Sequence, residues 1–216
     1  MTRHFIALLT GLLLLTFAPQ MVQSQNQASE VDAALLPVTG PVIDNFALVS
    51  NQLYRGAAPS DLAIQRLSGQ GFKTIIDLRL NGEGVRHEKA LADHLGIKYV
   101  HIPMGLTRPS ISQIVTFLRT VNNEHNQPVF IHCRYGADRT GMLVGIYRIL
   151  VENWSYEKVY SEMREHHFKP WLGGMRKTVE LVAENSSAQQ MLRTLMTDPN
   201  EQQAFALANR MTKLEP

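Results

Sequence analysis

The stretch PVFIHCRYGADRTG, residues 128–141, decides the fold of this chain. Its apolar start, VFI, predicts a buried strand, and the apolar run MLVGIYRILVE after it predicts a helix that begins near Thr140. The residues between Cys133 and Arg139 then form a tight loop, in which Gly136 permits a left-handed backbone. Loop amides and the positive end of the helix dipole converge on one place, which predicts an anion-binding site.

Cys133 is the only cysteine of the chain and lies at the base of this loop. A free thiol has a pKa near 8.5, and helix N-termini and cationic neighbours lower it to roughly 3.5–7.5. The planar guanidinium of Arg139 can bind two phosphate oxygens. A sulfur nucleophile under a bound phosphoryl group is the arrangement required for covalent phosphoryl transfer. The alternative, a structural cysteine in an ordinary strand-to-helix turn, does not account for His132, Gly136 and Arg139 around it.

The sequence HCRYGADRTG, residues 132–141, resembles the HCxxGxxRTG signature of the cysteine-dependent tyrosine and dual-specificity phosphatase superfamily. The segments NFALVSNQLYRGAAPS, KTIIDLRL, LGIKYVHIPM and WSYEKVYSEM are similar to segments of its compact branch, which includes atypical plant-and-fungal enzymes and bacterial tyrosine phosphatases. The resemblance covers about residues 45–168. It implies a phosphatase that uses neither a metal nor another cofactor.

The resemblance also assigns roles to residues of the signature. Cys133 is the nucleophile, which forms a thiophosphoryl-enzyme intermediate, and Arg139 binds the phosphate. Thr140 can hydrogen-bond the sulfur. For His132, the chemistry of the imidazole itself predicts donation to a backbone carbonyl, which shapes the loop. Both residues can also serve only to cap and pack a turn. The expected phosphate-binding residues are Arg134, Tyr135, Gly136, Ala137, Asp138 and Arg139.

The general acid is not evident, because the loop PMGLTRPS, residues 103–110, lacks the aspartate that many members of the superfamily carry there. Asp138 is the first candidate, since myotubularins have an acid at this position; the alternative is a loop carboxylate paired with an arginine. Asp77, near Arg79, is the second candidate and is more typical of a loop anchor. In a third interpretation, no protein acid is needed because the leaving group is already good, as in phosphoanhydrides.

The substrate class also stays open at the level of sequence. Phosphotyrosine and phosphoserine or phosphothreonine proteins compete with inositol phosphates, inositol pyrophosphates and other small phosphates, because one fold and loop serve all of these. Two other hypotheses are a non-catalytic phosphate-binding module and a rhodanese-like sulfurtransferase. The second is less consistent with His132 and the RTG ending. Several arginines could line the rim of the site, although an ordinary solvated surface position is the default for each. They are Arg55, Arg79, Arg86, Arg108 and Arg134, of which Arg134 is favoured because it lies in the loop.

The pattern along the chain predicts an α/β fold with a mostly parallel sheet flanked by helices and followed by extra C-terminal helices. Ser60, Ser110 with Gln113, and Ser155 predict helix starts. An edge hairpin is expected over residues 45–55, and strands over 73–78 and 97–102. Helices are expected over 60–68, with Leu62, Ile64 and Leu67 inward, and over 85–95, 110–122, from 154 and from 198 to 211. Trp171 is expected to pack C-terminal helices onto the domain.

The predicted organisation is a signal peptide over residues 1–24, a linker over 25–44, a phosphatase domain over 45–172 and a C-terminal helical extension over 173–216. The signal peptide implies a periplasmic or secreted protein; an uncleaved anchor through residues 5–17 is the alternative. A net charge of +2 gives no indication of nucleic-acid binding, and a single cysteine excludes an internal disulfide. His87, His94 and His101 lack the carboxylates expected of a metal site. The expected partner is a phosphorylated protein or a small phosphate, and no integral membrane domain beyond the signal segment is expected.

Overall fold

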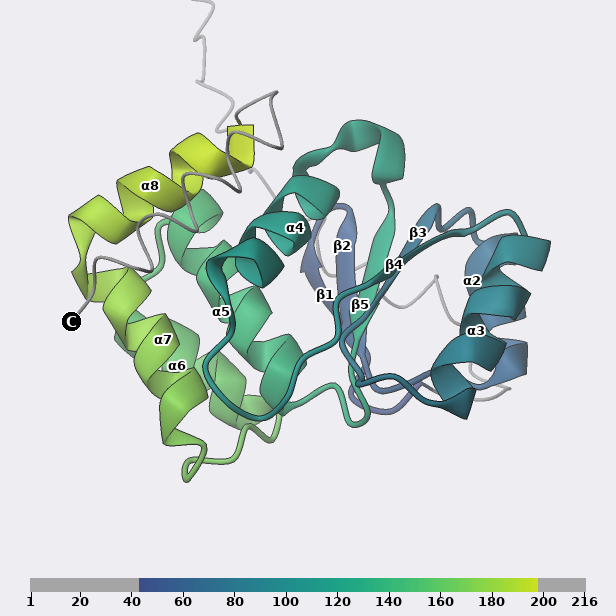
Figure 1. Cartoon of the computed structure of the whole chain (residues 1–216), viewed down its shortest axis with the longest axis horizontal. Coiled ribbons are helices and arrows are strands. Elements are labelled where there is room, and N and C mark those ends of the chain that lie inside the picture. The colour runs from purple at the N-terminus through teal and green to yellow at the C-terminus, as the bar shows by residue number, and fades with distance from the viewer. Residues whose placement is uncertain (1–42, 198–216) are drawn as a thin grey trace, which may run out of the picture.

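The computed structural model describes residues 43–197, which form a central sheet with helices on both faces (Figure 1). The strands are β1 (Ala47–Ser50), β2 (Leu53–Gly56), β3 (Thr74–Asp77), β4 (Lys98–His101) and β5 (Val129–His132). The helices are α2 (Asp61–Gly69), α3 (Glu83–His94), α4 (Ile111–Asn122), α5 (Asp138–Glu152), α6 (Tyr156–Glu165), α7 (Gly173–Glu184) and α8 (Ser186–Thr197), with a short 3-10 turn at Glu124–Asn126.

The strand order is β1-β2-β5-β3-β4, so the strand of the signature motif lies in the middle of the sheet. β2, β5, β3 and β4 run parallel, and only β1 is antiparallel, paired with β2 at one edge. The mostly parallel α/β fold and the edge hairpin predicted from the sequence are confirmed. The carboxyl ends of the parallel strands, where such folds place their ligands, lie together at the signature loop.

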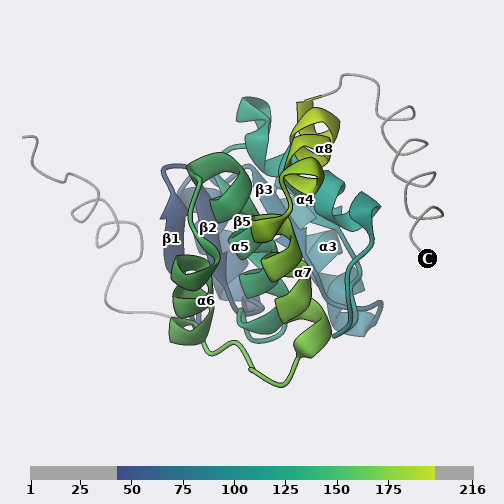
Figure 2. The same cartoon turned by 90° about the vertical axis from the view of Figure 1, so that its left-hand side faces the viewer.

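Alternate residues of the strands build two separate cores. Ile75 and Phe130 point to the side that α2 and α3 cover, together with Tyr54. Ile76 and Ile131 point to the opposite side, which α4 to α8 cover (Figure 2). Burial on both faces explains why VFI and TII read as continuous apolar runs rather than as alternating ones.

Local sequence signals predicted most boundaries of the helices and strands correctly. The hydroxyl oxygens of Ser60, Ser110 and Ser155 accept hydrogen bonds from amides in the first turns of α2, α4 and α6, and Gln113 completes the predicted capping box. The helix expected from residue 154 begins two residues later, at Tyr156. Two other helices begin two residues earlier than expected: α5 at Asp138 rather than near Thr140, and α3 at Glu83 rather than at residue 85. A polar first turn carries no apolar periodicity that would reveal it.

Two predicted burials are wrong. Leu62 on α2 is exposed, because the buried face of this helix is formed by Ala63, Ile64 and Leu67. Trp171 is 75% exposed and does not pack the C-terminal helices onto the domain. That packing comes instead from apolar residues of the two helices themselves, among them Val179 and Leu195.

The ends of the described region have their own features. Ile43, in the segment predicted as a linker, is buried in the core that contains Tyr54 and Phe130. α7 and α8 share the larger core with α4 and α5, on the left in Figure 1. The predicted signal peptide and the helix expected over residues 198–211 lie outside the described residues. Within residues 43–197, no helix combines the length and apolar character that crossing a membrane requires.

Candidate active site

The signature loop, residues 133–139, connects the end of β5 to the first turn of α5. Gly136 has φ 65°, and a Cβ there would lie 2.4 Å from the backbone carbon of Gly56. Only glycine therefore fits at this position. Cys133 is buried, at 2% exposure, and is the only free thiol of the chain. The loop thus holds a single potential nucleophile at its base, facing the start of a helix.

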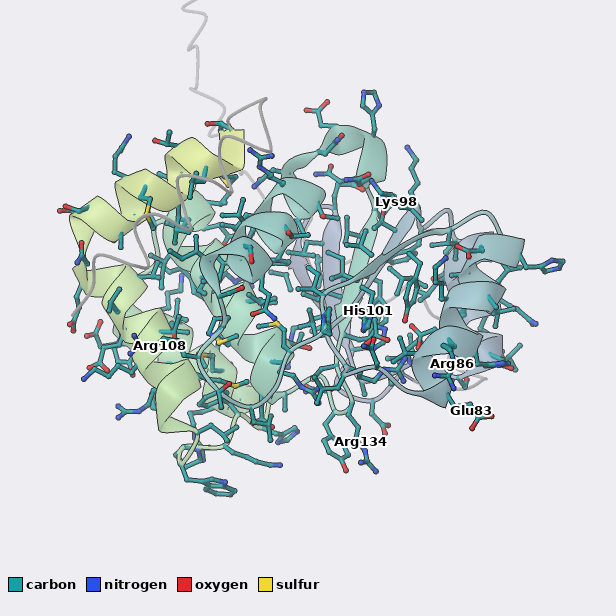
Figure 3. All side chains as sticks on the ribbon, viewed as in Figure 1. Glu83, Arg86, Lys98, His101, Arg108 and Arg134 are labelled. Carbon is teal, nitrogen blue, oxygen red and sulfur yellow. The ribbon has the colours of Figure 1, made fainter. Side chains whose placement is uncertain are left out.

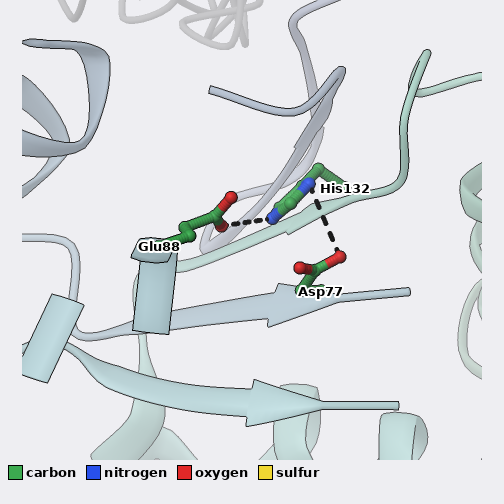
Figure 4. Close-up of side chains that lie close together, drawn as sticks. All are labelled: Asp77, Glu88 and His132. Carbon is green, nitrogen blue, oxygen red and sulfur yellow. Dashed lines mark hydrogen bonds and ion pairs between the residues drawn. The ribbon is translucent and has the colours of Figure 1, made fainter. Parts of the chain in front are cut away.

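His132 is fixed by a contact that sequence reasoning missed. Its Nε2 lies 2.7 Å from Oε1 of Glu88 on α3 (Figure 4). Its Nδ1 lies 3.3 Å from the carbonyl oxygen of Cys133. The predicted contact with a backbone carbonyl is thus present as the longer of the two. Nothing in the sequence around Glu88 distinguishes it from an ordinary helix carboxylate, because its partner lies 44 residues away.

Asp77 and Arg79 hold the end of β3 beside this histidine. Burial raises the pKa of Asp77, but this effect is outweighed by hydrogen bonds from the Arg79 side chain, the charge of His132 and the hydrogen bond from the Tyr99 hydroxyl. The net pKa of Asp77 therefore lies below its usual value. Arg79 Nη2 lies 2.7 Å from Asp77 and 2.5 Å from Glu88. These contacts support the role of Asp77 as a loop anchor. They also occupy the carboxylates of Asp77 and Glu88, which lie close enough to His132 to share a metal ion.

Arg139 and Thr140 lie in the first turn of α5. Arg139 Nη1 donates to the carbonyl oxygens of Leu78 (3.3 Å) and Met104 (3.4 Å), which position the guanidinium between the loops that follow β3 and β4. Within the described region, Arg139 Nε and Thr140 Oγ1 are buried without a hydrogen-bond partner. A buried donor without a partner is costly, so these groups are available for a bound anion or the sulfur.

Asp138 is buried and bonded to the segment that follows α6. Its Oδ1 accepts a hydrogen bond from the backbone N–H of Lys169 (2.9 Å), and its Oδ2 lies 3.7 Å from Lys169 Nζ. The carboxylate is therefore paired with a lysine rather than with the arginine considered in the sequence analysis. The loop over residues 103–110 supplies no carboxylate, as its sequence shows.

A cleft of about 560 Å³ adjoins the loop on the Asp138 side. Tyr135 forms one wall and is 56% exposed, with the cations of Arg134 and Lys169 at 5.2 and 5.7 Å from its ring centroid. Two carboxylates line the same cleft, so its charge is mixed. The lining residues are Asp44, Asn45, Tyr135, Ala137, Asp138, His167 and Lys169.

The proposed cationic rim is not assembled as a group. Arg79 is engaged in the ion pairs described above, and Arg86 and Arg108 lie on different sides of Arg134 (Figure 3). The assignment of Arg55 to the solvent-exposed rim is wrong, because Arg55 is only 1% exposed. It extends from β2 to the signature loop, where its Nη2 donates to the Gly136 carbonyl oxygen (2.8 Å). Of the five cations, only Arg134 is both exposed and part of the loop.

A family model described as "DSP-PTPase phosphatase fused to NAD+ Kinase" matches residues 43–195. The chain belongs to this family of dual-specificity and tyrosine phosphatases. The dual specificity protein phosphatase TpbA of Pseudomonas aeruginosa is 26% identical over 145 residues, which are 65% of this chain and 64% of TpbA. The inositol diphosphatase SIW14 of Saccharomyces cerevisiae is 30% identical over 134 residues, 58% of this chain and 46% of SIW14. The match thus spans less than two thirds of each relative.

Solved structures share the fold. The catalytic core of Siw14 superposes with a TM-score of 0.60 at 25% identity, covering 72% of this chain and 95% of that structure. P. aeruginosa TpbA superposes with a TM-score of 0.57 at 23% identity, covering 74% and 94%. The predicted membership in the atypical dual-specificity branch and the predicted fold class are confirmed.

Proposed function

We propose that this chain is a cysteine-dependent phosphatase that hydrolyses phosphomonoesters, with Cys133 as nucleophile. The observation that carries the proposal is the position of Cys133, which is buried at the base of a loop closed by Gly136 and followed directly by α5. The proposed phosphate-binding residue is Arg139, and its buried Nε, which has no hydrogen-bond partner within the described residues, supports this role. Membership in the phosphatase family supports the same conclusion.

The reaction proceeds in two displacements. The thiolate of Cys133 attacks phosphorus, the bond from phosphorus to the leaving oxygen breaks, and a thiophosphoryl-enzyme forms. Water then attacks phosphorus, the phosphorus–sulfur bond breaks, and phosphate and the thiolate are released. Arg139 and the loop amides stabilise the equatorial oxygens in both steps. The proposed role of Thr140 is to stabilise the sulfur as it leaves, which its buried Oγ1 without a hydrogen-bond partner in the described region supports.

Phosphotyrosine, with phosphoserine and phosphothreonine, is the proposed substrate group, and a phosphorylated protein the proposed partner. A TpbA structure is a complex with pTyr. The exposed ring of Tyr135 offers an apolar wall for a substrate ring. The carboxylates of Asp44 and Asp138 in the adjoining cleft disfavour a second phosphate there. Inositol phosphates and pyrophosphates are the second candidate, because relatives include inositol diphosphatases and Arg134 and Lys169 lie near Tyr135.

The proposed location is periplasmic or secreted, on the basis of the apolar segment within residues 1–24. An uncleaved anchor over residues 5–17 is the alternative. Fractionation of cells that express the full chain distinguishes the two, because a cleaved product is shorter and an anchored one stays with the membrane fraction.

Hydrolysis of an activated aryl phosphate by the reduced full chain, in the presence of EDTA, tests the proposed chemistry. Turnover is expected to persist with EDTA and to disappear in Cys133→Ser, because a hydroxyl lacks the acidity of the thiol. Binding of inorganic phosphate by a wild-type protein without turnover would instead identify a phosphate-binding module. A panel of phosphotyrosine peptides and inositol phosphates then ranks the substrates by kcat/KM.

A further inference from the structure

The carbonyl groups of the signature loop are held by the N-terminal part of the domain. Three consecutive carbonyl oxygens accept hydrogen bonds from residues 45–58: Arg134 O from the Ala58 amide (3.4 Å), Tyr135 O from Asn45 Nδ2 (3.2 Å) and Gly136 O from Arg55 Nη2 (2.8 Å). The C=O and N–H of one peptide unit point in opposite directions. Carbonyls held outward therefore keep the intervening amides turned toward the anion site.

Arg55 makes the shortest and most buried of these three contacts. It is placed there because β2 runs parallel to β5, with Arg55 opposite Ile131. Its Nε and Nη1 are buried and have no hydrogen-bond partner within residues 43–197. Removing such a cation from water costs free energy, and a buried charge adds little to the stability of the fold. Stability alone therefore does not account for the buried position of Arg55.

The charges around Arg55 indicate what this cation acts on. Burial lowers the pKa of Arg55 to about 10, although the charge of Glu162 acts in the opposite direction. The side chain is therefore positively charged at neutral pH. Glu162 already forms an ion pair with Arg148 (2.5 Å). Cys133 lies at the start of the loop whose Gly136 carbonyl oxygen Arg55 binds, so the buried cation acts on the part of the loop that holds the sulfur.

We propose that Arg55 is a positioning residue, which holds the loop amides inward through the Gly136 carbonyl and favours the thiolate of Cys133 by its buried charge. The proposal rests on the proposed function in one respect, namely that Cys133 reacts as a thiolate. Arg55 acts through the Gly136 carbonyl of the loop, which makes it a positioning residue rather than a catalytic one.

The test measures the alkylation rate of the reduced full chain by iodoacetamide across pH. Alkylation reports on Cys133 alone, since the chain has one cysteine. Arg55→Gln, which removes the charge, is compared with Arg55→Lys, which keeps it, and with Lys89→Met as a control that removes an exposed cation from α3. Turnover of an aryl phosphate and protection from alkylation by inorganic phosphate are measured in parallel, and circular dichroism confirms folding.

In Arg55→Gln, we expect the pH midpoint of alkylation to rise by about one unit or more, which is the usual effect of removing a close opposite charge. Turnover near neutral pH is then expected to fall at least about tenfold. Arg55→Lys is expected to keep the midpoint but to lose turnover and phosphate protection, because an ammonium group does not reproduce the planar guanidinium. Lys89→Met is expected to match the wild type in all three measurements.

A folded Arg55→Gln protein with the wild-type midpoint overturns the proposal, and so does an equal rise of the midpoint in both Arg55 variants. If Arg55→Gln does not fold, Arg55→Lys alone tests the proposal. A raised pH midpoint of alkylation in Arg55→Lys overturns it, and so do unchanged turnover and phosphate protection. Alkylation needs no turnover, so an inactive wild type counts against the proposed function while the role of Arg55 is still measured.

Discussion

Gly136 lies where any side chain would collide with the backbone of residues 56 and 57, at 2.4 to 2.7 Å. The collision is with backbone atoms, which cannot move aside as a flexible side chain can. Its φ of 65° adds a second reason, because a left-handed backbone costs a residue with a Cβ about 1–2 kcal/mol. The conformation of the signature loop therefore requires a glycine at position 136.

Gly136→Ala is expected to lower the free energy of unfolding by more than about 1 kcal/mol and turnover by about 100-fold or more, since small displacements of reacting groups are that costly. Urea unfolding and aryl phosphate kinetics measure the two effects. Gly173→Ala is the matched control, because a Cβ there meets nothing within 4 Å. Similar losses in both variants would show that the position of Gly136 is not special.

Asp138 illustrates how a contact can limit a chemical role. Its carboxylate is occupied by the backbone and side chain of Lys169, contacts that favour an anchoring role between the loop and the segment after α6. If Asp138 is nevertheless the general acid, Asp138→Asn slows hydrolysis of alkyl phosphates far more than of aryl phosphates with acidic leaving groups, by about 10²–10⁴-fold. From the contacts, we expect similar losses on both substrates. A large difference between the two would restore Asp138 as the acid.

At the scale of elements, α7 and α8 complete the core rather than lie on its surface. Met175, Val179, Val182, Leu192 and Leu195 belong to the same cluster as the buried residues of α4 and α5. Arg119 Nε on α4 also donates to the Leu195 carbonyl oxygen (2.8 Å). The helices over residues 173–197 therefore support α5, the helix that carries Arg139.

Leu195→Ala is expected to destabilise the fold by about 2–5 kcal/mol, the usual range for a buried leucine. Unfolding in urea should still show one transition, because α8 shares a core with α4. Leu181→Ala on the partly exposed face of α7 is the control and should change stability by about 0.5 kcal/mol or less. A separate early transition for α8, with turnover unaffected, would show that these helices are a dispensable addition.

At the scale of the whole molecule, the loop is held by segments that are distant in sequence. Asn45 Nδ2 donates to the Tyr135 and His166 carbonyl oxygens, and Asn45 Oδ1 lies 2.7 Å from His166 Nδ1. One side chain thus connects the start of the domain, the signature loop and the end of α6. Burial lowers the pKa of His166. The charges of Arg55 and His167 lower it further, whereas those of Glu162 and Glu165 raise it.

A lowered histidine pKa means that the unfolded chain binds a proton more readily than the folded one. Stability is then complete above about pH 6.5 and is lost as the pH falls below that value. We expect the free energy of unfolding of the wild type to drop between pH 7.5 and 5.5, and His166→Gln to show a smaller drop. An equal pH dependence in both proteins would assign the effect to other groups.

The sequence by itself determined the parts that depend on neighbours along the chain. The capping box of Ser110 and Gln113, the apolar strand before His132 and the glycine of the signature loop act within a few residues, so their patterns are visible in the sequence. The family resemblance and the proposal of Cys133 as nucleophile come from the same short stretch. A mostly parallel sheet followed from the alternation of strands and helices.

Only the tertiary structure decided which side chains support that stretch. Arg55 appears in the sequence as one cation among many, yet it is buried against Gly136, 81 residues further along the chain. Glu88 is a helix carboxylate like others, yet it orients His132 across 44 residues. Such contacts depend on which strands become neighbours and which face a helix turns inward. These are properties of the packed sheet and helices, and no local pattern encodes them.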